Sequence, residues 1–156
     1  MQQPKIILFL CTGNYFRSRF SEELFNHWAL RMNIGWHAES RGLMRDMRSL
    51  KSKNMGKISR HTLSALEMRG VRVKSADRWP RSVTRAELEY ADHTIALKED
   101  EHRPMMDAWF PDLADKIEYW AVDDIDVLPA KHCIAQAEKN LLALLQKIRR
   151  EHPGSP

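Results

Sequence analysis

The stretch Cys11-Thr12-Gly13-Asn14-Tyr15-Phe16-Arg17-Ser18 joins a predicted strand to a predicted helix. The residues before it, Lys5 to Leu10, are apolar from Ile6 onward and are typical of a buried strand. After it, apolar side chains recur every four residues, which is the spacing of one helix face: Phe20, Leu24, Trp28 and Met32. The pattern therefore places a cysteine at the end of a strand and an arginine at the start of a helix.

A loop of this kind can bind phosphate. Gly13 can adopt backbone angles that are closed to other residues, so several amide N–H groups can turn inward. These amides and the helix N-terminus form an anion site, and Arg17 adds a planar set of donors that matches two phosphate oxygens. The same positive field favours the thiolate form of Cys11, which is the nucleophilic form. The loop thus predicts a nucleophile held in a phosphate-sized site.

The Cys-x5-Arg-Ser pattern so close to the N-terminus resembles the low-molecular-weight protein tyrosine phosphatase family, whose superfamily includes arsenate reductases. Weaker matches follow in the family's order over nearly the whole chain. They are Glu39 to Gly42, Thr62 to Leu66 with Gly70-Val71, Leu88 to His93, Lys98 to His102 in the loop after the third strand, and Tyr119 to Asp124 in the segment of the general acid. The resemblance implies a phosphomonoester hydrolase, in particular a protein tyrosine phosphatase that forms a cysteinyl-phosphate intermediate. Its substrate would be a phosphotyrosine protein or a small aryl phosphate.

The resemblance also implies roles for single residues. Cys11 would be the nucleophile, Arg17 would bind the phosphate and stabilise the transition state, and Asp124 would protonate the leaving group. Ser18 would donate to the Cys11 sulfur, although it could instead cap the helix. The remaining substrate-binding residues would be Thr12, Gly13, Asn14, Tyr15, Phe16 and Ser40, with Asn14 and Ser40 holding the loop in shape.

The chain departs from the family pattern at several points. The family usually has an aspartate followed by proline at the acid, whereas this chain reads Asp124-Ile125-Asp126-Val127-Leu128-Pro129, so Asp123 and Asp126 are alternatives to Asp124. Phe16 replaces a second cysteine that many members have. The bulk of Tyr15 argues against the narrow pocket of the arginine-phosphate phosphatases, and it could form a stacking wall or pack in the core. Arg19 replaces the usual proline.

Length and pattern predict one α/β domain. A chain of 156 residues with 43% hydrophobic content is too short for two ordinary domains, and we expect a domain over residues 1–152 with an exposed tail at 153–156. Strands alternate with helices, which predicts a three-layer fold with a central four-stranded parallel sheet flanked by helices, the phosphate loop following the first strand. The other predicted elements are strands at Trp36 to Ser40, His93 to Leu97 and Ile117 to Ala121, and helices after Ser59, after the capping box Thr84 to Glu87 and after Pro129.

Composition excludes several classes of protein. No apolar stretch reaches membrane-spanning length and no signal peptide is evident, so we expect a cytoplasmic protein without a membrane partner. Cys11 and Cys133 are the only cysteines, which suits a reducing compartment. No Cys or His pair has zinc-ligand spacing, so neither a metal nor a cofactor is expected. Nucleic-acid binding is not expected either, because the basic residues lack interleaved aromatics.

The positive charge is uneven along the chain. The stretch from Arg41 to Arg60 carries one acid, Asp46, against seven basic residues: Arg41, Arg45, Arg48, Lys51, Lys53, Lys57 and Arg60. Such a stretch could be a solvated face or a rim that attracts an anionic substrate.

Two alternatives to hydrolysis stay open. An arsenate reductase of this superfamily needs further cysteines as a relay, and none lies between Cys11 and Cys133, so only a variant that uses an external small thiol fits. A non-catalytic module that binds phosphate or a phosphoprotein is the second alternative. Arg19, Phe16 and the missing proline after Asp124 favour it, whereas the presence of Cys11, Arg17, Ser18 and an acid argues against it.

Overall fold

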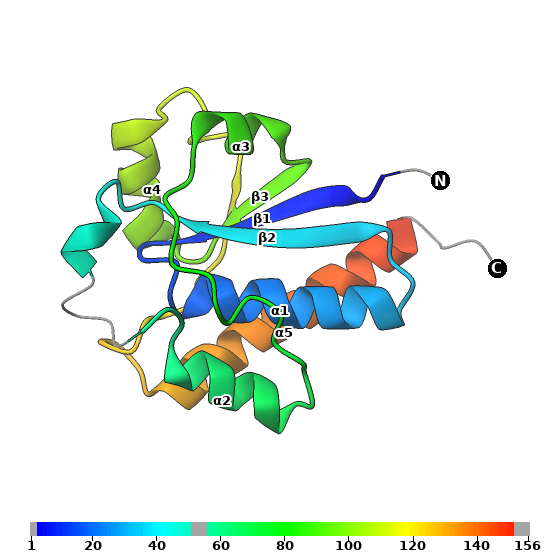
Figure 1. The fold of residues 1–156 in the computed structure, drawn as a ribbon. Helices are drawn as coiled ribbons and strands as arrows, with labels where there is room; N and C mark the ends of the chain where they lie inside the picture. The colour runs from blue at the N-terminus through cyan, green and yellow to red at the C-terminus, as the bar shows by residue number, and fades with distance from the viewer. Residues whose placement is uncertain (1–2, 51–55, 152–156) are drawn as a thin grey trace.

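The computed structural model describes residues 3–50 and 56–151. The predicted tail at 153–156 and two members of the basic stretch, Lys51 and Lys53, lie outside these ranges. Within them the chain forms a single α/β domain (Figure 1). No helix in the described ranges is both long enough and apolar enough to cross a bilayer.

The sheet has four parallel strands, as predicted. They are β1 Lys5–Cys11, β2 Trp36–Gly42, β3 His93–Ala96 and β4 Glu118–Tyr119, and their order in the sheet is β2-β1-β3-β4. The β4 strand is shorter than predicted. The register pairs Lys5 with Trp36 and ends with Cys11 opposite Gly42, so the carboxyl ends of β1 and β2 lie side by side.

Helices cover both faces of the sheet, which confirms the three-layer prediction (Figure 1). One face carries α1 Arg17–Arg31, α2 Arg60–Met68 and α5 Ala130–Glu151, and the other carries α3 Arg85–Tyr90 and α4 Glu99–Trp109. A short 3-10 helix, η1 Met47–Leu50, follows β2.

The β1 strand explains why its sequence is continuously apolar. Ile7 and Phe9 pack into the core beneath α1 and α5, while Leu8 and Leu10 pack into the separate core beneath α3 and α4. A strand buried on both faces has no solvent side to fill with polar residues. The apolar stripe predicted for α1 is less complete, because Trp28 remains 36% exposed.

Local sequence signals set several helix ends. The Thr84 hydroxyl accepts from the Glu87 amide while the Glu87 carboxylate accepts from the Thr84 amide, which is the predicted capping box of α3. After α2, Gly70 adopts a left-handed φ of 69°, a conformation that favours glycine. The predicted loop over Lys98 to His102 is wrong: α4 begins at Glu99, and its first turn holds three acids, which the helix dipole favours.

The strand order places the functional site. From β1 the chain goes to β2 on one side and later to β3 on the other, so the direction of winding reverses between β1 and β3. In open α/β sheets, ligands bind at the carboxyl ends of the strands at such a point. The loop after β1 therefore faces the segment after β3.

Leu141 offers a test of the core packed beneath α1 and α5. It is fully buried on α5, whereas its neighbour Leu142 is 40% exposed. We expect Leu141→Ala to lower the free energy of unfolding by about 2–5 kcal/mol, because it leaves a cavity. The matched Leu142→Ala should lower it by about 1 kcal/mol or less in the same denaturant titration. Equal losses would contradict this packing.

Candidate active site

The loop between β1 and α1 takes its shape from Asn14. This residue is fully buried and has a left-handed φ of 49°, which asparagine tolerates better than most residues. The sequence predicted unusual backbone angles at Gly13, whereas the left-handed residue is Asn14, one position later.

Gly42 lets the end of β2 approach this loop closely. A Cβ atom at Gly42 would lie 2.7 Å from the Thr12 carbonyl oxygen and 3.1 Å from the Asn14 amide nitrogen. Real Cβ atoms essentially never come as close as the first of these distances, and the second is tighter than most. Only glycine fits here, and the loop is held against β2 as a result.

A chain of hydrogen bonds leads from Glu22 to Cys11. The Ser40 hydroxyl donates to Glu22 Oε1 at 2.7 Å, and Asn14 Nδ2 donates to both Ser40 Oγ at 3.0 Å and Ser18 Oγ at 2.9 Å. Because Ser18 Oγ accepts from Asn14, its own proton can point to Cys11 Sγ, which lies 3.0 Å away. The structure thus places Ser18 within hydrogen-bond distance of Cys11 and Asn14 within hydrogen-bond distance of Ser40. Ser18 does not cap the helix, since the N-cap of α1 is Phe16.

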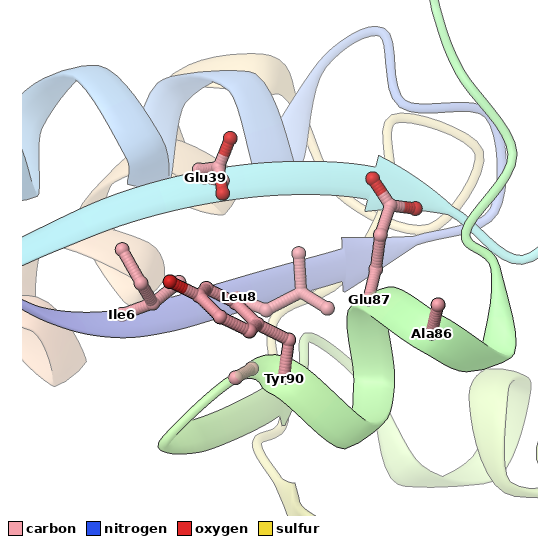
Figure 2. A pocket seen from close by; sticks show the side chains of 7 residues that line it. Ile6, Leu8, Glu39, Ala86, Glu87 and Tyr90 are labelled. Atoms are coloured by element: carbon pink, nitrogen blue, oxygen red, sulfur yellow. The ribbon is translucent and has the colours of Figure 1, made fainter.

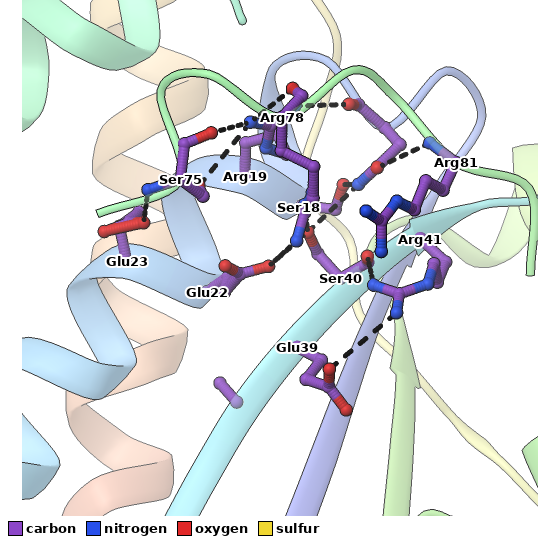
Figure 3. A network of polar contacts seen from close by, with 12 residues as sticks. Ser18, Arg19, Glu22, Glu23, Glu39, Ser40, Arg41, Ser75, Arg78 and Arg81 are labelled. Atoms are coloured by element: carbon purple, nitrogen blue, oxygen red, sulfur yellow. Dashed lines mark hydrogen bonds and ion pairs between the residues drawn. The ribbon is translucent and has the colours of Figure 1, made fainter. Parts of the chain in front are cut away.

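Two residues that sequence reasoning missed, Arg78 and Arg81, orient the donors and acceptors of this series of hydrogen bonds (Figure 3). The Arg81 amide donates to Asn14 Oδ1 at 3.1 Å, which turns the Asn14 amino group towards the two serines. The Arg78 guanidinium donates to Glu22 Oε1 at 3.2 Å and to Ser40 Oγ at 3.0 Å. No motif marks Arg78 or Arg81, because their role depends on where the segment before α3 crosses the loop.

Arg19 is fully buried and hydrogen-bonds to the backbone of the loop and of neighbouring segments (Figure 3). Its two amino groups donate to four carbonyl oxygens, those of Asn14, Lys57, Ser75 and Arg78. Burial, together with the positive charge of Arg78, lowers the pKa of Arg19 to about 10. The residue that replaces the family proline therefore ties the loop to two distant segments.

Arg17 brings the loop together with the segment after β4. Its Nη1 donates to the Val122 carbonyl at 3.0 Å, and its Nη2 donates to Glu101 Oε2 at 2.6 Å and to Asp124 Oδ2 at 3.4 Å. Burial alone would lower the pKa of Arg17, but the hydrogen bond to Glu101 and the attraction of the neighbouring negative charges together outweigh it, and the pKa is raised. Arg17 is therefore charged, and it lies beside one of the candidate acids.

The three candidate aspartates have different surroundings. Asp123 accepts from Lys98 Nζ at 2.7 Å and from Gln136 Nε2 at 3.0 Å, and these hydrogen bonds lower its pKa. Asp126 is exposed, whereas Asp124 is half-buried and lies next to Arg17. Asp124 is thus the aspartate of the three that contacts the phosphate-loop arginine.

The first turn of α4 supplies two further site residues that the sequence analysis did not single out. Glu101 Oε2 accepts from the Thr12 hydroxyl as well as from Arg17. His102, fully buried, places Nε2 3.1 Å from the same Glu101 oxygen. Burial alone would raise the pKa of Glu101, but the hydrogen bonds from His102 and Arg17 hold it well below its ordinary value. An ionised carboxylate therefore lies at the phosphate loop.

Tyr15 and Phe16 differ in their surroundings. Tyr15 is half-buried, while the Phe16 side chain is buried in the core, with its ring 6.2 Å from that of His61. Any contact of Phe16 with an anion would therefore come from its backbone amide.

Much of the basic stretch is engaged in internal contacts. Arg41 is buried and donates to Glu87 Oε2 at 2.7 Å, and Arg45 donates to the Val83 carbonyl at 2.8 Å. Arg48 pairs with Asp46 at 3.1 Å. These arginines stabilise the loop after β2. A rim that attracts an anionic substrate would therefore depend on the remaining basic residues of the stretch.

A separate pocket of about 320 Å³ lies on the sheet face beneath α3 (Figure 2). Its lining is mostly apolar and contains none of the predicted site residues: Ile6, Leu8, Glu39, Ala86, Glu87, Tyr90 and Ala91. It is distinct from the phosphate loop.

The family comparison agrees with this geometry. The family described as low molecular weight phosphotyrosine protein phosphatase matches residues 6–153. The chain belongs to this family. A search of curated proteins finds no match.

Solved structures share the fold of this phosphatase-family member. The low molecular weight protein tyrosine phosphatase of T. tengcongensis is 24% identical with a TM-score of 0.72, and the match covers 94% of this chain and 99% of that one. The YwlE arginine phosphatase of Geobacillus stearothermophilus is 23% identical with a TM-score of 0.68, covering 98% and 100%. A thioredoxin-dependent arsenate reductase of Corynebacterium glutamicum is 19% identical with a TM-score of 0.67, covering 96% of this chain and 64% of its own.

Arg17 is the first residue to test. We expect Arg17→Lys to abolish measurable binding of phosphate or vanadate, because a point charge cannot replace the planar set of donors. Isothermal titration calorimetry with each anion measures this. Arg31→Lys, at the exposed end of α1, is the matched control and should bind as the wild type does. Normal anion binding by Arg17→Lys would exclude Arg17 from the site.

Proposed function

We propose that the protein is a phosphomonoester hydrolase of the protein tyrosine phosphatase type, which acts through a cysteinyl-phosphate intermediate. The observation that carries the proposal is that Cys11, Arg17 and Asp124 are held at one loop. Cys11 Sγ lies 3.0 Å from Ser18 Oγ, and Arg17 Nη2 lies 3.4 Å from Asp124 Oδ2. We also propose that the protein is located in the cytoplasm, since both described cysteines are free thiols.

In the first step the Cys11 thiolate attacks phosphorus. An S–P bond forms and the bond from phosphorus to the leaving oxygen breaks, while Arg17 stabilises the charge on the transferring phosphoryl group. Asp124 donates its proton to the leaving oxygen, so that a phenol rather than a phenolate departs. The phosphoryl group is then on Cys11 and Asp124 is ionised.

In the second step water attacks the phosphoenzyme. Asp124 takes the proton from the water, the S–P bond breaks, and inorganic phosphate forms. The Ser18 hydroxyl donates to the departing sulfur and stabilises the thiolate. Asn14 supports this role, because its amino group occupies the acceptor side of Ser18 Oγ and leaves the proton for Cys11.

The proposed substrate is a phosphotyrosine protein or a small aryl phosphate. The description of the family supports it. An acid beside Arg17 also supports it, because a phenolate leaving group gains from protonation. The bulk of half-buried Tyr15 argues against an arginine-phosphate substrate.

Arsenate reduction has less support. Cys133 is fully buried, its thiol donates to the Leu128 carbonyl at 3.5 Å, and burial raises its pKa. A thiol in this state is a poor relay for oxidising equivalents. One comparison tests the proposal: hydrolysis of an aryl phosphate against arsenate-dependent oxidation of an added thiol. Hydrolysis alone supports the proposal, arsenate-dependent oxidation alone supports the reductase, and neither activity supports a binding module.

Cys11→Ser should abolish hydrolysis while phosphate or vanadate still binds. A serine hydroxyl is not ionised at neutral pH, but the loop amides and Arg17 remain. Steady-state turnover of an aryl phosphate and calorimetric anion binding measure the two effects. Cys133→Ser is the control and should keep its turnover. If Cys11→Ser hydrolysed the substrate at a rate near that of the wild type, Cys11 would not be the nucleophile.

Asp124→Asn should slow hydrolysis by roughly 10²- to 10⁴-fold for leaving groups of high pKa, the range typical of the loss of a general acid. The loss should shrink for leaving groups of low pKa, which depart without a proton. A series of aryl phosphates measures this dependence.

Asp123→Asn and Asp126→Asn are the matched controls for the acid. Neither should show the dependence on the leaving group. If one of them does and Asp124→Asn does not, the acid is misassigned, and if none does, the chain lacks a general acid.

A further inference from the structure

The Glu101 carboxylate makes an unusual contact for a site that binds an anion. One of its oxygens, Oε2, accepts hydrogen bonds from the Thr12 hydroxyl and from Arg17 Nη2, the latter at 2.6 Å. His102 Nε2 lies 3.1 Å from the same oxygen. Its side chain is 30% exposed, so it lies at the wall of the site rather than in bulk solvent. Thr12 and Arg17 come from the two ends of the phosphate loop, and Glu101 connects them.

His102 fixes this carboxylate in place. The Lys98 amide donates to His102 Nδ1 at 3.0 Å, so the proton of the neutral ring is on Nε2. Nε2 then donates towards Glu101 Oε2 and lies 3.2 Å from Thr12 Oγ1. Burial lowers the pKa of His102 and keeps the ring neutral. The tautomer is therefore set by a backbone amide at the start of α4.

Two simpler roles do not fit Glu101. A general acid must hold a proton, whereas the hydrogen bonds to Glu101 favour its ionised form. A gate that leaves when phosphate enters would take the carboxylate partner away from the Nε2 proton of a fully buried histidine, and only the Thr12 hydroxyl at 3.2 Å would remain as an acceptor.

We propose that Glu101 is a positioning residue for phosphoryl transfer, which aims the Arg17 guanidinium and holds Thr12 while His102 holds Glu101. This inference rests on the proposed phosphatase function. Val122 supports one amino group of Arg17 through its carbonyl, and Glu101 supports the other. With both supports in place the plane of the guanidinium is set before the substrate arrives, which is what efficient transition-state stabilisation requires.

Glu101→Gln is the main test, because it removes the charge and keeps the size. We expect kcat to fall on the order of 10²-fold with KM near that of the wild type, the loss that follows from a misplaced reacting group. The loss should be the same for leaving groups of high and low pKa, since Arg17 acts on the phosphoryl group. Glu99→Gln, in the same turn of α4 and paired with Arg103, is the matched control and should leave kcat unchanged.

Two results would overturn the proposal. If Glu101→Gln binds inorganic phosphate at least tenfold more tightly and keeps its kcat, the carboxylate opposes the substrate instead of aiming Arg17. A loss confined to leaving groups of high pKa would make Glu101 the acid.

A pair of His102 variants tests the same proposal without changing Glu101. A glutamine amide reaches about as far as Nε2 and keeps the donor to Glu101, whereas an asparagine amide reaches only about as far as Nδ1 and loses it. We expect His102→Asn to lose kcat as Glu101→Gln does and His102→Gln to keep most of it, with thermal unfolding confirming that each variant is folded. Equal kcat values for the two variants would contradict the role of His102.

The wild type separates the two proposals. A wild-type protein that neither hydrolyses an aryl phosphate nor binds phosphate would refute the phosphatase function itself, and the inference with it. A wild type that does both, beside an unchanged Glu101→Gln, would refute only the positioning role.

Discussion

The hydrogen bonds of one buried asparagine are the constraint on which the site depends. Asn14 is fully buried in a left-handed conformation, and its amide donates to Ser18 and Ser40 and accepts from the backbone of Arg81. A buried amide that lost these partners would be costly, so the loop has one well-defined shape. That shape brings Ser18 to Cys11. The close approach of Gly42 to the loop backbone leaves no room for a different loop shape.

Buried charge is the second theme of the site. Arg17 is balanced by Glu101 and Asp124, and Arg78 by Glu22. Arg19 is different, because carbonyl oxygens rather than carboxylates surround it. Each of these pairs has one buried member, Arg17 or Glu22, and removing its partner would leave a buried charge uncompensated, which is costly. A rigid wall of charges of this kind suits a reaction that depends on the placement of a guanidinium around phosphorus.

Sequence reasoning succeeded where the signal is local. The strand, loop and helix around Cys11, the capping box at Thr84 and the four-stranded parallel sheet are set by short-range patterns, and the structure has all of them. It failed at Lys98 to His102, which the family resemblance placed in the loop after the third strand, whereas α4 begins at Glu99. It also assigned the left-handed turn to glycine, whereas Asn14 has it because the network compensates the strain.

By itself the sequence determined the fold class, the strand, loop and helix around Cys11, and the family, because these depend on residues that are adjacent in the chain or periodic within one element. Only the tertiary structure decided which aspartate lies beside Arg17 and that Glu101, His102, Arg78 and Arg81 belong to the site. These residues are 60 or more positions from the loop, and no spacing rule connects them to it. Their roles arise where the parallel sheet brings the ends of its strands to one edge, which is a property of the folded chain.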